Sequence, residues 1–176
     1  NPPTGLAAAS ISTGSLVLGW SPNSNPAYTR YEISMSSDNF VLHYSTFAEF
    51  SQNFTGLTVG VTGLEPGTIY QFRVRTINGQ AADNSGSLTS NFANISVITL
   101  ATAPVLSGVA VGSQIDWSWL AVKGASGYRL FAANGGPLMI DTFNPLVLNF
   151  SSTNLNVNFL YGAQVQAYDA SGSGAF

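Results

Sequence analysis

The sequence predicts an all-β protein made of two antiparallel β-sandwiches in tandem. Alternation of apolar and polar residues dominates the 176 residues, and no long stretch keeps helical spacing. Turn-forming runs such as SPNSNP, LEPG and NGGP separate the alternating segments into short strands. One pattern of strands also occurs twice along the chain, which indicates two copies of a single unit.

The strands of the first copy have one apolar and one polar face. Residues 16–20 and 31–36 alternate in this way, and the stretch 69–77 does so most clearly. Its apolar face carries Tyr70, Phe72 and Val74, and its polar face carries Gln71, Arg73 and Arg75. Such a pattern is typical of half-buried antiparallel strands with one face in water.

The repeat is visible in aromatic and apolar residues at equivalent places. Leu16, Leu18 and Trp20 of the first copy recur as Ile115, Trp117 and Trp119, and a Tyr then opens the next strand in both copies. The segment Ala101-Thr102-Ala103-Pro104 forms the junction, which predicts one domain over residues 1–101 and a second over 102–176. Because this junction is short, we expect the two domains to follow each other as a spacer.

The first copy resembles the fibronectin type III domain from its first strand to its last. The resemblance rests on PPTGL, SLVLGW, YEISM, GLEPGTIYQFRVRTING and ISVITLATAP, which follow one another in the order of that family. It implies two immunoglobulin-like antiparallel β-sandwiches in tandem. A tyrosine that precedes the penultimate strand fills a corner of such sandwiches and bonds back to upstream backbone. The resemblance assigns this role to Tyr70.

The second copy matches the same family more loosely, through APVLSG, IDWSWL, YRLFA and LNVNFLYGAQVQAYDASG. Val157 stands where the first copy has Pro66, so the corner is less well defined here. Tyr161 opens the predicted penultimate strand. The counterpart of the last strand of the first copy would fall near residues 186 to 191, beyond Phe176. We therefore expect the last strand of the second domain to be missing from these residues.

Four aromatic residues are predicted to form the structural core. Each takes an inward position of an alternating strand: Trp20, Tyr70, Trp119 and Tyr161. Trp117 shares a face with Trp119, so it is also expected in the core; the alternative is that both line an outer platform for sugars.

Composition limits the classes of partner and the location. Charged residues make up 7% and the net charge is −3, and the five cations form no cluster that could follow a phosphate backbone. We expect no nucleic acid partner and no membrane insertion, because no apolar run is long enough to span a bilayer. A surface rich in Asn, Ser and Thr with few lysines favours an extracellular or cell-surface protein of bacterial origin. Three Asn-x-Ser/Thr triplets, at Asn53, Asn94 and Asn149, are either glycosylation acceptors or chance occurrences.

Residues for catalysis or metal binding are sparse. His43 is the only histidine, the sequence has no cysteine, and none of the eight carboxylates form an Asp-x-Asp pair. No Gly-x-Ser-x-Gly context marks a nucleophile. We predict no enzyme activity, no cofactor and no metal site, although a weak calcium site at residues 36–39 is an alternative to an Asx-turn there.

Aromatic residues concentrate in DNFVLHYSTFAEFSQNFTG, which suggests a candidate binding surface. Its members are Phe40, Tyr44, Phe47 and Phe50. Aromatic rings on a sandwich face can stack on sugars or anchor a protein interface. In the competing interpretation, Phe40, Leu42 and Tyr44 share one face of a fourth strand and cover the core. Phe47, Phe50 and Phe54 then fill the loop that crosses between the sheets.

These observations predict a non-catalytic structural or adhesive module of a larger protein, acting as spacer or assembly unit. The missing last strand would come from the continuing chain or from another subunit. The alternative function is a carbohydrate- or protein-binding accessory module of a secreted enzyme. The expected partners are other domains of the same polypeptide or neighbouring subunits, with a glycan or protein as ligand.

Overall fold

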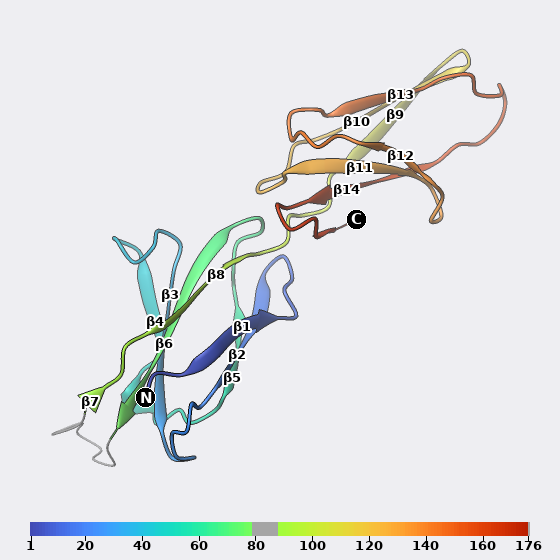
Figure 1. Cartoon of the computed structure of the whole chain (residues 1–176). Helices are drawn as coiled ribbons and strands as arrows, with labels where there is room; N and C mark the ends of the chain where they lie inside the picture. The colour runs from blue at the N-terminus through green and yellow to red at the C-terminus, as the bar shows by residue number, and fades with distance from the viewer. Residues whose placement is uncertain (79–87, 176) are drawn as a thin grey trace. The chain divides into compact units, whose positions relative to one another are not determined.

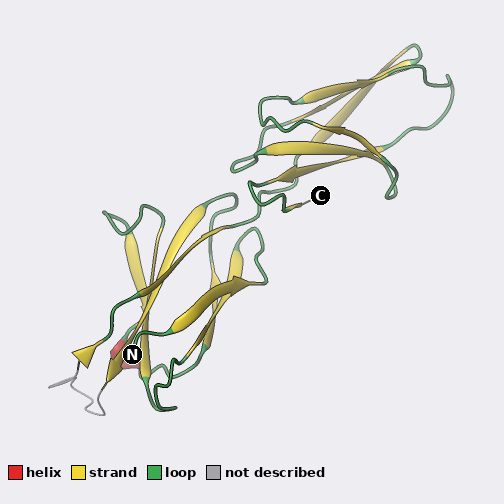
Figure 2. Ribbon diagram, viewed as in Figure 1, coloured by secondary structure: helices red, strands yellow, loops and turns green. Residues whose placement is uncertain are grey.

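The computed structural model describes residues 1–78 and 88–175, which consist almost entirely of antiparallel strands (Figures 1 and 2). The chain divides into two compact units. The first contains Asn1–Leu64 and Ile69–Thr99, and the second contains Leu100–Phe176 together with Glu65–Thr68. The all-β prediction is confirmed. Among the described residues, no helix is long and apolar enough to cross a membrane.

The first unit is a sandwich of two sheets that face each other (Figure 1). One sheet has the order β1 (Thr4–Ala9), β2 (Ser15–Ser21) and β5 (Thr58–Thr62). The other sheet has the order β4 (Tyr44–Ala48), β3 (Arg30–Ser36), β6 (Ile69–Asn78) and β8 (Ala93–Ile98), and β7 (Leu88–Thr89) pairs with the end of β6. A short 3-10 helix, η1 (Phe50–Gln52), follows β4.

The core of the first unit follows from the alternation in its strands. Along β2, every second side chain is buried, and Trp20 is 6% exposed. Its indole ring packs 5.4 Å from the ring of Tyr31, which lies on β3 in the opposite sheet. Tyr70 at the start of β6 is 8% exposed and belongs to the same cluster. The two sheets are therefore held together by the residues that the period-two pattern places inside.

The second unit repeats this arrangement. One sheet has the order β13 (Asn149–Ser152), β10 (Gln114–Trp119) and β9 (Leu106–Val111). The other has the order β12 (Leu138–Asp141), β11 (Gly127–Ala132), β14 (Ala163–Tyr168) and β15 (Gly174–Ala175). Trp117 and Trp119 are both buried, and the indole N–H of Trp117 donates to the hydroxyl of Ser152 at 2.9 Å. These tryptophans point inward, so they do not form an outer platform.

A two-residue strand follows β14 at a place where the alignment of the two copies predicts a loop. It is β15, which pairs Gly174 with Tyr168 and Ala175 with Ala167. A tight turn brings the chain back, because the buried carboxylate of Asp169 accepts hydrogen bonds from the backbone N–H groups of Ser171 (2.8 Å) and Ser173 (3.2 Å). The structure thus adds a two-residue strand that the alignment did not predict, and the expectation of a strand near residues 186 to 191 stays a prediction.

The predicted fourth strand is also different in the structure. It begins only at Tyr44, and Leu42 is 77% exposed instead of covering the core. Phe40 has a positive φ of 62°, which does not fit an extended strand. Residues 37–43 form a loop, because the carboxylate of Asp38 accepts hydrogen bonds from backbone N–H groups of this segment.

Tyr161 lies just before β14 and is half-buried, so it is not part of the buried core as predicted. Its hydroxyl does accept a hydrogen bond from the backbone N–H of Asn156 at 3.0 Å. This contact reaches back to upstream backbone, as a corner tyrosine does.

Candidate binding surface on the first unit

The loop between β3 and β4 is organised around the carboxylate of Asp38. This group accepts hydrogen bonds from the hydroxyl of Ser36 (2.7 Å) and from the backbone N–H groups of Leu42 (2.9 Å) and His43 (2.8 Å). The bond from Ser36, joined by those from His43 and Leu42, holds the pKa of Asp38 well below its ordinary range. The ionised carboxylate thus fixes the loop, and its oxygens are engaged as in an Asx-turn.

His43 lies in this loop and is exposed; its Nδ1 is 3.0 Å from an oxygen of Asp38. Among the described residues, the only side chain that hydrogen-bonds to the His43 ring is Asp38, so no hydroxyl nucleophile is paired with this histidine there. Within residues 1–78 and 88–175, no group of three or more His, Asp or Glu side chains could hold a metal ion.

The outer face of the sheet β4-β3-β6-β8 carries a set of stacked arginines and rings, which we call the arginine–aromatic cluster. Its members are Phe40, Tyr44, Phe50, Arg73, Arg75 and Phe92. The guanidinium carbon of Arg73 lies 4.1 Å from the ring centroid of Phe40 and 4.4 Å from that of Phe92. At such distances, the ring quadrupoles attract the cation. The rings therefore hold the guanidinium of Arg73 in one place on the sheet.

The two arginines of this cluster differ in their charge partners. Arg75 donates from Nε to a carboxylate oxygen of Glu32 at 2.7 Å. For Arg73, the described part of the chain provides no carboxylate within 4.0 Å, and its buried Nε has no hydrogen-bond partner there. Leaving a buried donor without an acceptor costs about 1 to 3 kcal/mol. Arg73 is therefore a cation that is stacked between rings and has no ion-pair partner among the described residues.

A hollow of about 260 Å³ borders the cluster beside Phe40. Polar side chains of the loop, β6 and β8 line it: Asn39, Gln71, Asn94 and Ser96. The backbone N–H of Asn39 donates to the side-chain oxygen of Gln71 at 3.2 Å, which ties the loop to β6. In the strand register, Asn94 lies directly opposite Arg73. The hollow therefore combines the aromatic residues Phe40 and Phe72 with several amide groups next to the cation.

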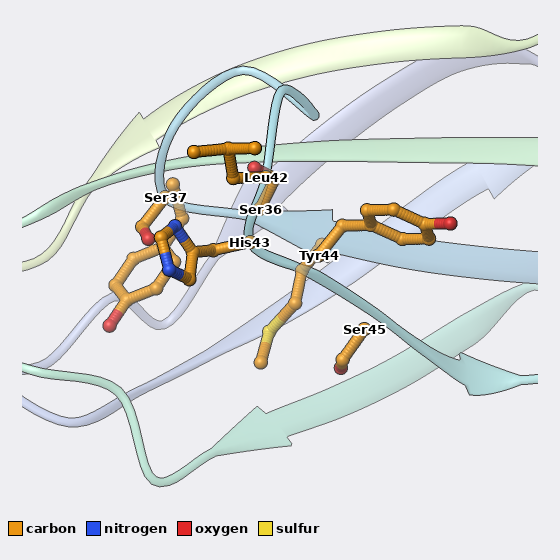
Figure 3. Close-up of a pocket in the computed structure, with 8 residues that line it drawn as sticks. Ser36, Ser37, Leu42, His43, Tyr44 and Ser45 are labelled. Atoms are coloured by element: carbon orange, nitrogen blue, oxygen red, sulfur yellow. The ribbon is translucent and has the colours of Figure 1, made fainter.

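A larger pocket of about 400 Å³ lies on the other side of the loop. Met35 and Tyr70 give it an apolar wall that continues into the core. Figure 3 shows Leu42 and His43 of the loop and Tyr44 of β4 around it. Tyr44 lines this pocket and also contacts Arg73 of the arginine–aromatic cluster.

The structure divides the predicted binding surface into two groups. Phe40 and Tyr44 contact Arg73 on the outer face, and Tyr44 is 59% exposed. Phe50 is buried and contacts Arg75 at 5.5 Å. Phe47 lies on β4 and is partly buried against the core of the first unit, whereas the competing interpretation places it in the loop between the sheets.

Sequence reasoning missed Phe92 as a member of the cluster. This residue precedes β8, so no alternation marks the side to which its ring points. The available signal was the pair Arg73 and Arg75, which the alternation of 69–77 had already placed on the outer face. Cations on one strand face attract rings and carboxylates that lie within reach, so the neighbouring aromatic residues were candidates for such contacts.

The three glycosylation triplets have exposed asparagines, at Asn53, Asn94 and Asn149. Whether they carry sugars stays a prediction. The predicted core residues Trp20, Tyr70 and Trp119 are buried, whereas Tyr161 is half-buried.

Comparison with known proteins shows which family and which solved structures the chain resembles. The sequence model of the family described as the fibronectin type III domain matches residues 1–90. A two-domain fibronectin type III segment of chicken tenascin superimposes with a TM-score of 0.54 and 16% identity, covering 96% of this chain and 91% of that one. A computationally redesigned β-sandwich protein gives a TM-score of 0.44 and 22% identity over 56% of this chain and 89% of its own. No curated relative matches the sequence. The chain therefore belongs to the fibronectin type III family and consists of two such immunoglobulin-like sandwiches in tandem.

Proposed function

We propose that the chain is a non-catalytic structural and adhesive module of a larger extracellular or cell-surface protein of bacterial origin. Domains of the fibronectin type III family are typically structural or adhesive and are generally not catalytic. The observation that carries the adhesive part is the arginine–aromatic cluster, which presents a fixed cation among rings on a sheet face. A face of this kind is suited to contact with a partner.

The adhesive role can be tested with two exposed tyrosines of the first unit. The intact chain is immobilised on beads and offered an array of extracellular proteins and glycans. Tyr44→Ser removes a ring of the cluster on β4, whereas Tyr28→Ser removes a ring that is also 59% exposed but lies in the turn before β3. We expect attachment that falls with Tyr44→Ser and persists with Tyr28→Ser. Attachment that is equal for both variants, or absent for the unmodified chain, would contradict the proposal.

The spacer role is supported by the separate cores. Leu18, Trp20 and Phe72 belong to the core of the first unit, and Trp119 and Leu130 belong to that of the second. A module that transmits tension needs units that each resist unfolding. Single-molecule stretching of the intact chain should therefore show two discrete unfolding events. A single event, or extension without resistance, would count against the spacer role.

The alternative is a carbohydrate- or protein-binding accessory module of a secreted enzyme. The amide-lined hollow beside Phe40 supports this reading, because amides and rings are common in sugar sites. The sequence that flanks these residues in the gene distinguishes the two: a catalytic domain there favours the alternative.

Completion of the second unit by a strand from another chain is a narrower form of the assembly proposal. The chain's own β15 already pairs with Ala167 and Tyr168, so a donated strand would have to extend or displace it along β14. Polymerisation that rises with concentration and survives dilution would support donation. A monodisperse monomer would contradict it.

A further inference from the structure

We propose that the arginine–aromatic cluster of the first unit binds a carboxylate-bearing glycan, with the carboxylate on Arg73 and a sugar ring in the hollow beside Phe40. The ligand class is an oligosaccharide that contains uronic acid residues. This inference rests on the proposed adhesive function and names the ligand of the same face.

Arg73 is prepared for a carboxylate in three respects. Its guanidinium is held near the rings of Phe40 and Phe92, so little rotamer freedom is lost when a ligand binds. The rings lie against the flat faces of the guanidinium group. An acceptor can therefore approach only the N–H groups at its edge. No carboxylate among the described residues competes for the charge of Arg73, so a ligand carboxylate would be bound by its terminal Nη groups and not by the buried Nε.

The hollow next to Arg73 supplies groups for the rest of a sugar. The amides of Asn39, Gln71 and Asn94 offer donors and acceptors for hydroxyl groups, and so does the hydroxyl of Ser96. The ring of Phe40 gives an apolar wall on which the C–H face of a sugar ring can lie. Amide and aromatic groups thus line a hollow whose members Phe40 and Asn94 lie next to the cation of Arg73.

The charges on this face favour a sparsely charged glycan over a polyanion. Arg75 is already neutralised by Glu32, and Glu49 lies with Glu32 at a second hollow of about 260 Å³ beside Phe50. Arg73 is therefore the cation of this face that has no counter-charge among the described residues. The carboxylates of Glu32 and Glu49 on the same face would repel a chain of closely spaced phosphates or sulfates. One carboxylate on a sugar ring matches this arrangement. An acidic peptide could also supply a carboxylate, but it would not use the amide groups of the hollow.

The test is calorimetric titration of the intact chain with oligosaccharides of galacturonate, glucuronate and mannuronate. The comparison ligands are the same oligosaccharides with reduced, neutral carboxyl groups and a penta-glutamate peptide. We expect at least one acidic oligosaccharide to bind, and its neutral form to bind at least tenfold more weakly, because a hydrogen bond to a charged group contributes about 1.5 to 3 kcal/mol. The peptide should bind more weakly than the acidic glycan.

Two variants examine the cluster and the hollow separately. Arg73→Lys keeps the charge but loses the planar donors, and should weaken binding about tenfold or more. Ser96→Tyr fills the hollow without touching Arg73 and should abolish binding. Arg129→Lys in the second unit is the matched control, because Arg129 also stacks on a ring but is paired with Asp141. It should bind as the unmodified chain does. Circular dichroism of each variant checks that it is folded.

Three results would overturn the proposal: no acidic oligosaccharide binds, the neutral forms bind equally well, or the peptide binds more tightly than the glycans. Binding that is unchanged in folded Ser96→Tyr would also overturn it. The proposed function is judged separately by the bead assay. Attachment there that depends on Tyr44, with no binding of acidic glycans, would reject the ligand and keep the adhesive role. Loss of both would reject the two proposals together.

Discussion

The two units of the chain use an arginine on the outer sheet face in opposite ways. In the second unit, Arg129 lies 4.2 Å from the ring of Tyr168 and donates from Nε to Asp141 at 2.9 Å. The hydroxyl of Tyr168 donates to the other oxygen of Asp141 at 2.7 Å. In the first unit, Arg73 also lies against rings but has no such carboxylate among the described residues. The same contact of ring and cation therefore supports structure in one unit and leaves the charge available for binding in the other.

A second difference lies at equivalent ends of the central strands. In the first unit, Arg30 is opposite Ile77, and in the second unit Gly127 is opposite Tyr168. A β-carbon at position 127 would meet the phenol ring of Tyr168, with Cζ at 2.6 Å. A residue without a side chain thus makes room for the tyrosine that closes the network with Asp141. The glycine at position 127 and the tyrosine at position 168 therefore depend on each other. Together they give this end of the second unit's sheet contacts that differ from those of Arg30 and Ile77 in the first unit.

The largest expected effect comes from removing the core tryptophan of either unit. Trp20→Ala and Trp119→Ala should each cost about 3 to 5 kcal/mol of stability, because both indoles are buried against a tyrosine of the opposite sheet. Hydrogen exchange followed by mass spectrometry resolves the two units by peptide. We expect faster exchange in the altered unit alone. Equal loss of protection in both units would show that they unfold together, against the separate cores described above.

The charged network of the second unit gives the next effect. Asp141→Asn removes an acceptor charge shared by Arg129 and Tyr168, and should destabilise this unit by about 2 to 3 kcal/mol in denaturant titrations near pH 7. In the first unit, Arg73→Ala breaks no ion pair among the described residues and should cost less. A loss for Arg73→Ala that equals that for Asp141→Asn would remove the contrast between the two arginines.

The same network predicts the direction of acid destabilisation. Burial raises the pKa of Asp141, but the hydrogen bonds from Tyr168 and Arg129 outweigh it, so the pKa lies below its ordinary value. The unfolded chain therefore takes up a proton at higher pH than the folded unit does. The contribution of Asp141 is full above its unfolded pKa of about 3.9 and is lost as the pH falls below that value. The unmodified second unit should lose stability there, and Asp141→Asn should flatten this dependence.

Gly127→Ala probes the space beside Tyr168. The added methyl group collides with the phenol ring, so the hydroxyl is displaced from Asp141, at a cost of about 2 kcal/mol. Gly60→Ala on β5 is a control, because a β-carbon there meets no atom within 4 Å. Denaturant titrations of both variants compare them directly. A stability loss for Gly60→Ala as large as that for Gly127→Ala would mean that backbone preference, and not the ring, explains the effect.

Much of the fold could be predicted because period-two alternation reports burial strand by strand. Trp20 and Trp119 are buried where the repeat places them. The position of Phe40 could not be predicted in this way, because it depends on Asp38 capturing backbone N–H groups three to five residues further along the chain. The two-residue strand β15 could not be predicted for a similar reason. Asp169 makes a short turn there, whereas the alignment of the two copies assumed a loop of equal length.

The smallest effect is expected at Tyr161, the corner tyrosine of the second unit. The resemblance assigns this role to Tyr70 in the first unit, and in the second unit the hydroxyl of Tyr161 accepts a hydrogen bond from the backbone N–H of Asn156, upstream of it. Tyr161→Phe removes that bond and keeps the ring, so it should cost about 1 kcal/mol. In thermal unfolding, such a loss lowers the midpoint of a unit of this size by about 4 to 8 °C.

Tyr28→Phe is the control for Tyr161→Phe, because Tyr28 is largely exposed and should tolerate the change. If Tyr161→Phe leaves the midpoint unchanged, water replaces the lost hydroxyl at this half-buried position. The ring packing, which includes Phe159 at 5.3 Å, would then account for what Tyr161 contributes. If the midpoint falls as expected, the corner is maintained without the proline of the first copy, because a single hydrogen bond to Asn156 fixes the chain just before β14.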